Sequence, residues 1–196
     1  MTNNHNIKYL FEPRSIAIVG ASANKGKIGY AVVSNILTSK YPGRIYPINP
    51  HGGEILGLPI YKTINDVPND VDLVCITIPA KMVFDAVKNC ADKGFKYAAI
   101  ITSGFSEIGN LEEEHKIAEY ATARGMRIVG PNMFGIYSSM APVNATFGPA
   151  DIAEGNVAVI TQSGALGIAL IGKTKAENIG LSTIVSVAMS RSEVLA

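Results

Sequence analysis

A glycine-rich segment near the N-terminus is the first place where this sequence could bind a ligand. Gly20–Ser22 follows the apolar run Ser15–Val19, and a helical pattern begins at Ile28. Free backbone N–H groups and the helix dipole both favour an anion at such a junction, so the pattern predicts a phosphate site. Lys25 and Lys27 add positive charge beside it. An ordinary glycine-rich turn without a ligand would look the same, and the residues alone leave that alternative open.

The end of the second predicted strand, Arg44–Asn49, indicates which nucleotide would bind. Dinucleotide-binding folds carry an Asp or Glu there for the ribose 2′-hydroxyl. Here the run Arg44–Asn49 is followed by no acid before Glu54. The missing carboxylate argues against NAD and leaves room for a phosphorylated ribose. Lys40 and Arg44 are candidates to pair with such a phosphate, or are simply solvated.

A second loop with the same character lies near the C-terminus. Thr161–Gly167 again follows an apolar run and opens a helical pattern, with Ser163 as a favourable N-cap. Gly164 and Gly167 would leave the N-terminus of that helix accessible to phosphate or carboxylate. An ordinary capped helix explains the residues equally well.

The remaining polar positions at strand ends carry no group suited to bond-making chemistry. Loops that follow predicted strands contain Ile78-Pro79-Ala80-Lys81, Thr102-Ser103-Gly104-Phe105 and Gly130-Pro131-Asn132-Met133, without Cys, His or an acid. The three histidines, His5, His51 and His115, occupy a polar terminus, a loop and an acidic run. Cys75 and Cys90 fit neither a metal site nor a disulfide framework. These features predict a domain that binds a phosphorylated cofactor, with no catalytic residue and no metal.

Short β-branched runs alternate with longer helical patterns and would position these loops. Runs that are apolar throughout are typical of strands buried on both faces of a parallel sheet. Strands separated by helices also predict right-handed crossovers. We therefore expect an α/β fold with a Rossmann-type doubly wound parallel sheet. Its expected strands are Ser15–Val19, Arg44–Asn49, Val71–Ile78, Tyr97–Thr102 and Met126–Val129, and its expected helices are Ile28–Lys40, Met82–Lys93 and Leu111–Arg124.

The second part of the chain has a different organisation. Residues 131–155 contain three prolines and three glycines and interrupt the alternation, so we expect a linker at 136–155 between a first domain at 1–135 and a second at 156–196. Asn156–Thr161, Ser163–Ala176 and Leu181–Val187 predict a strand, a helix and a strand. Three elements are too few to bury a doubly wound core, so this second α/β domain is expected to be cut short.

Composition excludes several classes of protein. Of 196 residues, 47% are hydrophobic and 17% charged, and the net charge is +1 with no block of one sign. The chain therefore has material for a core and no basic groove for nucleic acid. The polar residues 1–12 predict no signal peptide, and no apolar run is long enough to predict a membrane helix. We expect a soluble, cytoplasmic protein.

Taken together, the motifs resemble a known family. In this order the chain contains Gly20-Ala21-Ser22, Tyr46-Pro47-Ile48-Asn49-Pro50, Ile78-Pro79-Ala80, Ile101-Thr102-Ser103-Gly104-Phe105, Gly130-Pro131-Asn132-Met133-Phe134-Gly135 and Thr161-Gln162-Ser163-Gly164-Ala165. This combination is similar to the α-subunit part of NDP-forming acyl-CoA synthetases, nearest to ADP-forming acetyl-CoA synthetase. Succinyl-CoA synthetase α-subunits are more distant. The resemblance extends from about residue 8 to residue 187.

The resemblance implies a CoA-binding Rossmann domain followed by the start of a flavodoxin-like domain. It implies coenzyme A as the cofactor, with the CoA diphosphate held by Gly20, Ala21, Ser22 and Lys25. Other implied contacts are Pro47, Asn49, Pro50, Ile78, Pro79, Ala80, Thr102, Ser103 and Gly104 along the adenine and pantetheine, and Asn132 and Met133 near the thiol. Ser163 and Gly164 would offer amides to a phosphoryl group.

The family's reaction is acyl-CoA + ADP + phosphate ⇌ acid + ATP + CoA, through an acyl phosphate and a phosphohistidine. It implies an ATP-grasp β subunit or domain as partner, and a homo-oligomer is a further expectation. The phosphohistidine lies beyond the region matched here, so this chain alone is expected to bind CoA without ligase turnover. The segment Val187–Arg191 also departs from the family, where glycine usually follows the last strand.

Two other functions stay open at this point. One is a stand-alone CoA-binding regulatory module, or the synthetase-like part of a protein acetyltransferase. The other is an NAD(P)-dependent dehydrogenase, which the acid-free strand tip disfavours.

Overall fold

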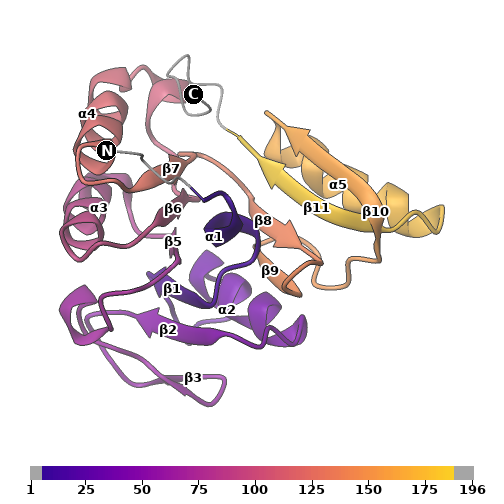
Figure 1. Ribbon diagram of the computed structural model, residues 1–196, viewed down its shortest axis with the longest axis horizontal. Helices are drawn as coiled ribbons and strands as arrows, with labels where there is room; N and C mark the ends of the chain where they lie inside the picture. Colours follow the sequence, from indigo (N-terminus) through magenta and orange to yellow (C-terminus); the bar gives the residue numbers. More distant parts are fainter. Residues whose placement is uncertain (1–5, 188–196) are drawn as a thin grey trace.

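Two sheets and a small hairpin organise the protein, as seen in a computed structural model that describes residues 6–187 (Figure 1). The first sheet contains β1 (Ser15–Val19), β2 (Arg44–Ile48), β5 (Leu73–Ile76), β6 (Tyr97–Ile100) and β7 (Arg127–Val129) in the order β2-β1-β5-β6-β7. All neighbouring pairs in it are parallel. The Rossmann-type parallel sheet expected from the apolar runs is confirmed.

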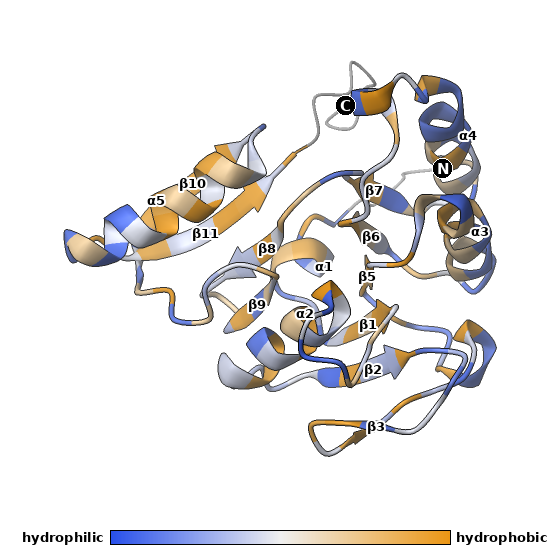
Figure 2. Cartoon of the chain, turned by 180° about the vertical axis from the view of Figure 1, so that it is seen from behind, coloured by the Kyte–Doolittle hydropathy of each residue, from blue (hydrophilic) through white to orange (hydrophobic). Residues whose placement is uncertain are grey.

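Alternate residues of the strands pack against different layers. One face of the sheet is covered by α3 (Val83–Asp92) and α4 (Leu111–Thr122), and the other by α2 (Ile28–Thr38). In Figure 2 the ribbon of α4 carries much hydrophilic blue, whereas β1 is largely orange. Because both faces of the sheet are covered, the side chains that point to either face are mostly apolar. The strands therefore appear in the sequence as continuous hydrophobic runs.

Pro47 lies inside β2 without disrupting the sheet. β2 is the edge strand and pairs only with β1 within the five-stranded sheet. A proline lacks the N–H needed for a ladder on both sides, and an edge position needs only one. The carbonyl of Pro47 accepts a hydrogen bond from Tyr61 N at 2.8 Å, so residues just after the hairpin β3 (Glu54–Ile55) and β4 (Leu58–Pro59) lie along this edge.

The segment expected to be a linker, residues 136–155, instead contributes strands. β8 (Gly135–Ser138) and β9 (Val143–Thr146) form an antiparallel pair. They join β10 (Glu154–Thr161) and β11 (Leu181–Ser186) in a mixed sheet of order β10-β11-β8-β9, with α5 (Gly164–Ala176) between β10 and β11. No local pattern marks these strands, because β8 pairs with β11, which lies far along the chain, and β9 pairs only with β8. The domain boundaries themselves stay a prediction.

The hairpin β8–β9 also covers part of the first sheet. Ile136, Val143 and Ala145 belong to the same buried cluster as Ile16 and Ile18 of β1. Asn35 of α2 donates from its side-chain amide to two backbone carbonyls of this region, Thr146 O and Gly148 O, both at 2.9 Å. The expected linker is therefore a structural layer shared by the two halves.

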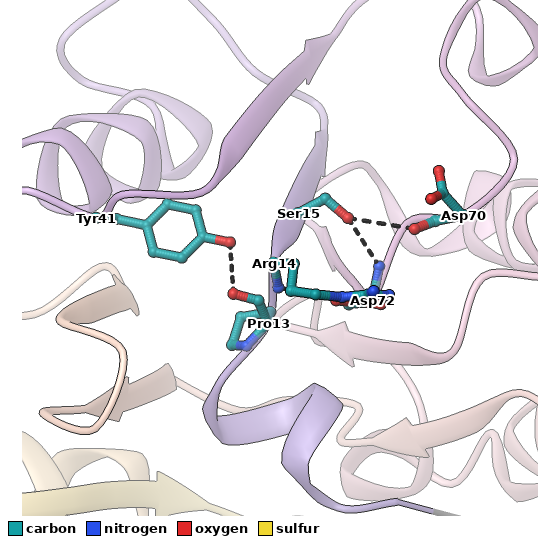
Figure 3. A network of polar contacts seen from close by, with 6 residues as sticks. All are labelled: Pro13, Arg14, Ser15, Tyr41, Asp70 and Asp72. Carbon is teal, nitrogen blue, oxygen red and sulfur yellow. Dashed lines mark hydrogen bonds and ion pairs between the residues drawn. The ribbon is translucent and has the colours of Figure 1, made fainter.

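A polar network lies at the amino edge of the first sheet (Figure 3). The buried carboxylate of Asp72 accepts hydrogen bonds from the backbone N, Nε and a terminal nitrogen of Arg14, at 2.8, 2.9 and 3.0 Å. Ser15 Oγ donates to the carbonyl of Asp70 and accepts from the backbone N of Asp72. Tyr41 donates its hydroxyl to the carbonyl of Pro13. These bonds join the starts of β1 and β5, on the edge opposite the predicted ligand loops.

Short elements complete the described part of the chain. They are α1 (Lys8–Phe11) and the 3-10 turns Ile64–Asp66, Ala80–Met82 and Ser106–Ile108. No helix among residues 6–187 is long and apolar enough to cross a membrane. No cluster of His, Cys, Asp and Glu suited to a metal ion occurs in the same residues. Of the expected departure from the family at Val187–Arg191, all but the first residue lie outside the described range.

Candidate functional site

The predicted ligand loops gather at one edge of the first sheet. Because β1, β5, β6 and β7 run parallel, the segments that follow Val19, Ile76, Ile100 and Val129 all leave the sheet at its carboxyl edge. The edge of an open α/β sheet where strands end is where such folds bind ligands. Lys40 and Arg44 precede β2 or begin it, so they lie toward the amino edge, and their suggested pairing with a ribose phosphate is not supported.

The glycines of the first loop are needed for packing within the protein. Gly20 has φ +97°, and a Cβ there would lie 2.6 Å from Thr77 Oγ1 and 2.9 Å from Ile78 Cγ2. A Cβ at Gly29, in the first turn of α2, would overlap the carbonyl of Gly20. Gly20 was predicted as a place of close approach to a diphosphate. The structure gives another reason for the glycine, which is close packing of α2 and β5 against the loop.

The loop between these glycines presents backbone N–H groups. Asn24 shapes it, because Asn24 N donates to Ser22 Oγ and Asn24 Oδ1 accepts from Gly26 N. Among the described residues, the amides of Ser22, Ala23, Lys25 and Ile28 have no hydrogen-bond partner. The N-terminus of α2 has neither a side-chain cap nor an acidic residue in its first turn. This arrangement leaves several donors and the positive end of the helix dipole for an anion.

Asn49 stands at the strand tip where dinucleotide folds carry a carboxylate. Its Nδ2 donates to the carbonyl of Ala21 at 2.7 Å, and its Oδ1 accepts from His51 N at 3.0 Å. In the structure both of its polar groups bind the main chain of the loop, and its expected contact with the cofactor stays a prediction. Of its predicted neighbours, Pro47 is buried and Pro50 is exposed.

The loops after β5 and β6 lie against each other. Thr102 Oγ1 donates to the carbonyl of Ile78 at 2.7 Å, and a Cβ at Gly104 would lie 3.0 Å from Ala80 Cβ. Pro79 and Ser103 are the exposed members of the predicted set here. Thr77 was not predicted, although its Oγ1 donates to the carbonyl of Val19 at 3.0 Å and so joins this pair of loops to the glycine loop.

Two glutamates that the sequence did not single out hold the loop after β6. Glu107 accepts hydrogen bonds from the backbone N–H groups of Gly104 and Phe105, and Glu114 accepts one from Ser106 N. Glu114 is only 4% exposed, and its Oε1 has no partner. Glu114 is the last residue of the acidic run Glu112–Glu114, and its burial could not be inferred from composition.

The loop after β7 has an unusual backbone. The Gly130–Pro131 peptide is cis, and Asn132 has φ +58°. Asn132 is exposed and donates its backbone N–H to the carbonyl of Thr102 at 2.9 Å, which places it beside the loop after β6. Met133, expected near a thiol, is only 2% exposed and belongs to a core cluster. Its side chain therefore packs inside the protein.

The second predicted anion loop lies at the N-terminus of α5. Ser163 is the N-cap, and its Oγ accepts from Leu166 N at 3.2 Å, as predicted. The amides of Gly164 and Ala165 have no partner in the described part of the chain. Gly167 does not keep the terminus open, because a Cβ there would lie 2.9 Å from the ring of Phe134.

Comparison with known proteins adds independent information. Residues 14–139 match the family model of a CoA binding domain, and residues 154–191 match that of a succinyl-CoA ligase-like flavodoxin domain. The α subunit of an ADP-forming acetate–CoA ligase I from Pyrococcus furiosus is 48% identical over 92% of this chain and 40% of its own length. An ADP-forming acetate–CoA ligase from Methanocaldococcus jannaschii is 44% identical over 93% of this chain and 26% of its own length.

Solved structures agree with this similarity. A dinucleotide-forming acetyl-coenzyme A synthetase 1 from Ca. Korarchaeum cryptofilum, solved with phosphate and ADP, superposes with a TM-score of 0.91 at 48% identity. The match covers 94% of this chain and 40% of that one. An ATP citrate lyase from Methanothrix soehngenii shares the fold alone, with a TM-score of 0.64 at 13% identity. The chain thus spans well under half the length of these relatives.

Proposed function

Because the chain belongs to the CoA-binding domain family, we propose that it is the CoA-binding part of an ADP-forming acyl-CoA synthetase. The observation that carries this proposal is the glycine loop between Gly20 and Gly29, where unpartnered amides and the uncapped end of α2 meet two exposed lysines. A CoA diphosphate supplies the negative charge that such a loop favours. The tip of β2 carries no acidic side chain, and a carboxylate there would repel the 3′-phosphate of CoA.

The other predicted positions have different roles in this proposal, from contact with the cofactor to support of the loops. Ser22 and Lys25 hold the diphosphate, while Gly20, Ala21 and Asn49 shape the loop. Exposed residues along the carboxyl edge line the path of the cofactor, with Asn132 at its thiol end. The remaining positions proposed for this path are Pro47, Pro50, Ile78, Pro79, Ala80, Thr102, Ser103 and Gly104. Met133 supports the path from the core.

Ser163 and Gly164 are proposed to receive the phosphoryl group. The free amides at the N-terminus of α5 provide the donors that a phosphate or acyl phosphate needs. In the whole enzyme, the reaction that we propose converts acyl-CoA, ADP and phosphate into acid, ATP and CoA. The relatives named as α subunits support a partner β subunit or domain of the ATP-grasp type, and a homo-oligomer remains part of the proposal.

Relatives also bear on the acyl group and on the alternatives. Their names include acetate, 4-hydroxybutyrate and trans-feruloyl, so the shared region proposed to bind CoA does not determine the acyl group. A regulatory module or a protein acetyltransferase is not favoured, because the relatives that match most of this chain at 48% and 44% identity are named as ligases. A dehydrogenase is disfavoured by Asn49, which occupies the position of the ribose-binding acid.

Calorimetry with CoA and NAD side by side tests the proposal. We expect CoA to bind and NAD to bind at least about tenfold more weakly. Lys25→Ala should weaken CoA binding by about tenfold, because one charge-assisted contact to the diphosphate is lost. Lys96→Ala is the matched control, since Lys96 is exposed at the amino end of β6 and should change the affinity by less than about twofold. NAD binding as tight as CoA binding would contradict the proposal.

A further inference from the structure

Two neighbouring residues connect the two halves of the protein. Met133 is buried in the cluster that contains β1 and α2, whereas Phe134 is buried in the cluster that contains Ile171 of α5. Both side chains are almost fully inaccessible, at 2% and 1% exposed. The side chains of two adjacent residues are therefore buried in two different hydrophobic clusters, one of the first sheet and one of the second.

Phe134 lies directly under the first turns of α5. A Cβ built at Gly164 would be 3.5 Å from Phe134 Cβ, and one at Gly167 would be 2.9 Å from Cε1 of its ring. The backbone is held as well, since Phe134 N donates to Ser186 Oγ at 2.9 Å and its carbonyl accepts from Phe147 N. Packing and hydrogen bonds thus fix Phe134 against the helix and two strands of the second sheet.

The same segment is fixed to the first sheet two residues earlier. Asn132 N donates to the carbonyl of Thr102 at 2.9 Å, in the loop proposed to line the cofactor path. Within three residues the chain passes from this loop to the N-terminus of α5. The distance between the loop after β6 and the N-terminus of α5 therefore depends on how Phe134 packs against Gly164 and Gly167.

We propose that Phe134 is a positioning residue that sets the phosphoryl-binding terminus of α5 against the CoA-binding edge. This inference rests on the proposed function. Reacting groups need a fixed separation, and small displacements of a binding loop are costly. Phe134 touches neither ligand in this account. It acts through Gly164 and Gly167, and the glycine at 167 is required because the ring occupies the space of a side chain.

Two glycines of the same helix provide a matched test. Gly167→Ala places a methyl group 2.9 Å from the ring, whereas Gly172→Ala meets nothing within 4 Å. Both changes bring the same gain in helix propensity, so their difference reports the contact with Phe134. Inorganic phosphate is titrated into the labelled protein while the NMR amide signals of Gly164 and Ala165 are followed. CoA affinity is measured by calorimetry on the same samples.

We expect Gly167→Ala to weaken phosphate binding at least threefold while CoA affinity stays within twofold of the unchanged protein. Gly172→Ala should alter neither affinity. Phe134→Leu, which removes ring contacts without a clash, should weaken phosphate binding in the same selective way. A purely structural role would lower the melting temperature and leave the phosphate affinity of the folded protein unchanged.

Several outcomes separate this inference from the function beneath it. Equal phosphate affinity in Gly167→Ala and Gly172→Ala overturns the positioning role. Absence of phosphate-induced shifts at Gly164 and Ala165 in the unchanged protein overturns the proposed phosphoryl site, and the positioning role with it. Lack of CoA binding in the unchanged protein overturns the proposed function instead, whatever the two glycine variants show.

Discussion

At the scale of single residues, polar side chains beside the candidate site bind the protein's own backbone. Asn49 uses both polar groups to hold the glycine loop, and Glu107 binds two amides of the loop after β6. A sequence shows that a polar residue follows a strand. It does not show whether the side chain turns outward to a ligand or inward to its own main chain.

The ion pair between Arg14 and Asp72 gives a prediction at this scale. Arg14→Met removes the guanidinium partner of a fully buried carboxylate, which should destabilise the protein by about 3 kcal/mol. This is the low end for buried pairs, because the arginine itself is 68% exposed. Chemical denaturation measures the change in the free energy of unfolding.

Glu177→Gln is the control for that experiment. Its ion pair with Lys173 is exposed and spaced i,i+4, so its loss should cost about 0.3–0.5 kcal/mol. A loss of stability in Arg14→Met no larger than in this control would show that Asp72 is satisfied without the guanidinium.

The sequence predicted where the candidate loops lie, and the roles of their residues stay predictions. Strand ends follow from periodicity, so the loops after β1, β5, β6 and β7 were found. Burial depends on contacts far along the chain, so the sequence did not reveal that the side chains of Met133 and Glu114 are buried. Lys40 and Arg44 were proposed to contact a ribose phosphate, although their places before and at the start of β2 put them toward the amino edge of the sheet.

At the scale of elements, the strands and helices of the first sheet were predicted to within a few residues. β8 and β9 were missed, since each has four residues and glycine or proline nearby, which locally favours a loop. What makes them strands is the pairing of β8 with β11 and the packing of β9 on α2. Such non-local contacts leave little local pattern.

The side chain of Asn35 joins α2 to the end of β9 by two hydrogen bonds, and their contribution to stability can be measured. Asn35→Ala loses two hydrogen bonds and leaves two carbonyls with fewer partners, so it should cost about 2 kcal/mol of stability. Asn89→Ala is the control, because Asn89 is an exposed helix residue of α3 and alanine should be neutral or slightly stabilising there. Equal stability of the two variants would contradict this role.

At the scale of the whole molecule, the two sheets share one core cluster. Ile136, Val143, Ala145 and Val185 from the second sheet are buried with residues of β1 and α2. In Figure 1 the hairpin β8–β9 lies between the first sheet and the arm formed by β10, α5 and β11. A shared core couples the stability of the two halves.

We therefore expect the protein to unfold in a single transition. Differential scanning calorimetry should give a calorimetric enthalpy equal to the van't Hoff enthalpy, and far-UV circular dichroism should follow the same curve. Two separate transitions, with the signals of β10 and α5 lost first, would show that the second sheet folds independently of the first.

The strand order also imposes a sequence of events on the ribosome. Every strand of the first sheet has been synthesised once residue 129 has emerged, and domains generally fold from the N-terminus as they appear. β8 ends at Ser138, yet its partner β11 begins only at Leu181. In the interval the nascent hairpin β8–β9 has an unpaired edge, and its contacts with α2 are available to hold it. The first sheet can thus act as the template on which the rest of the chain assembles.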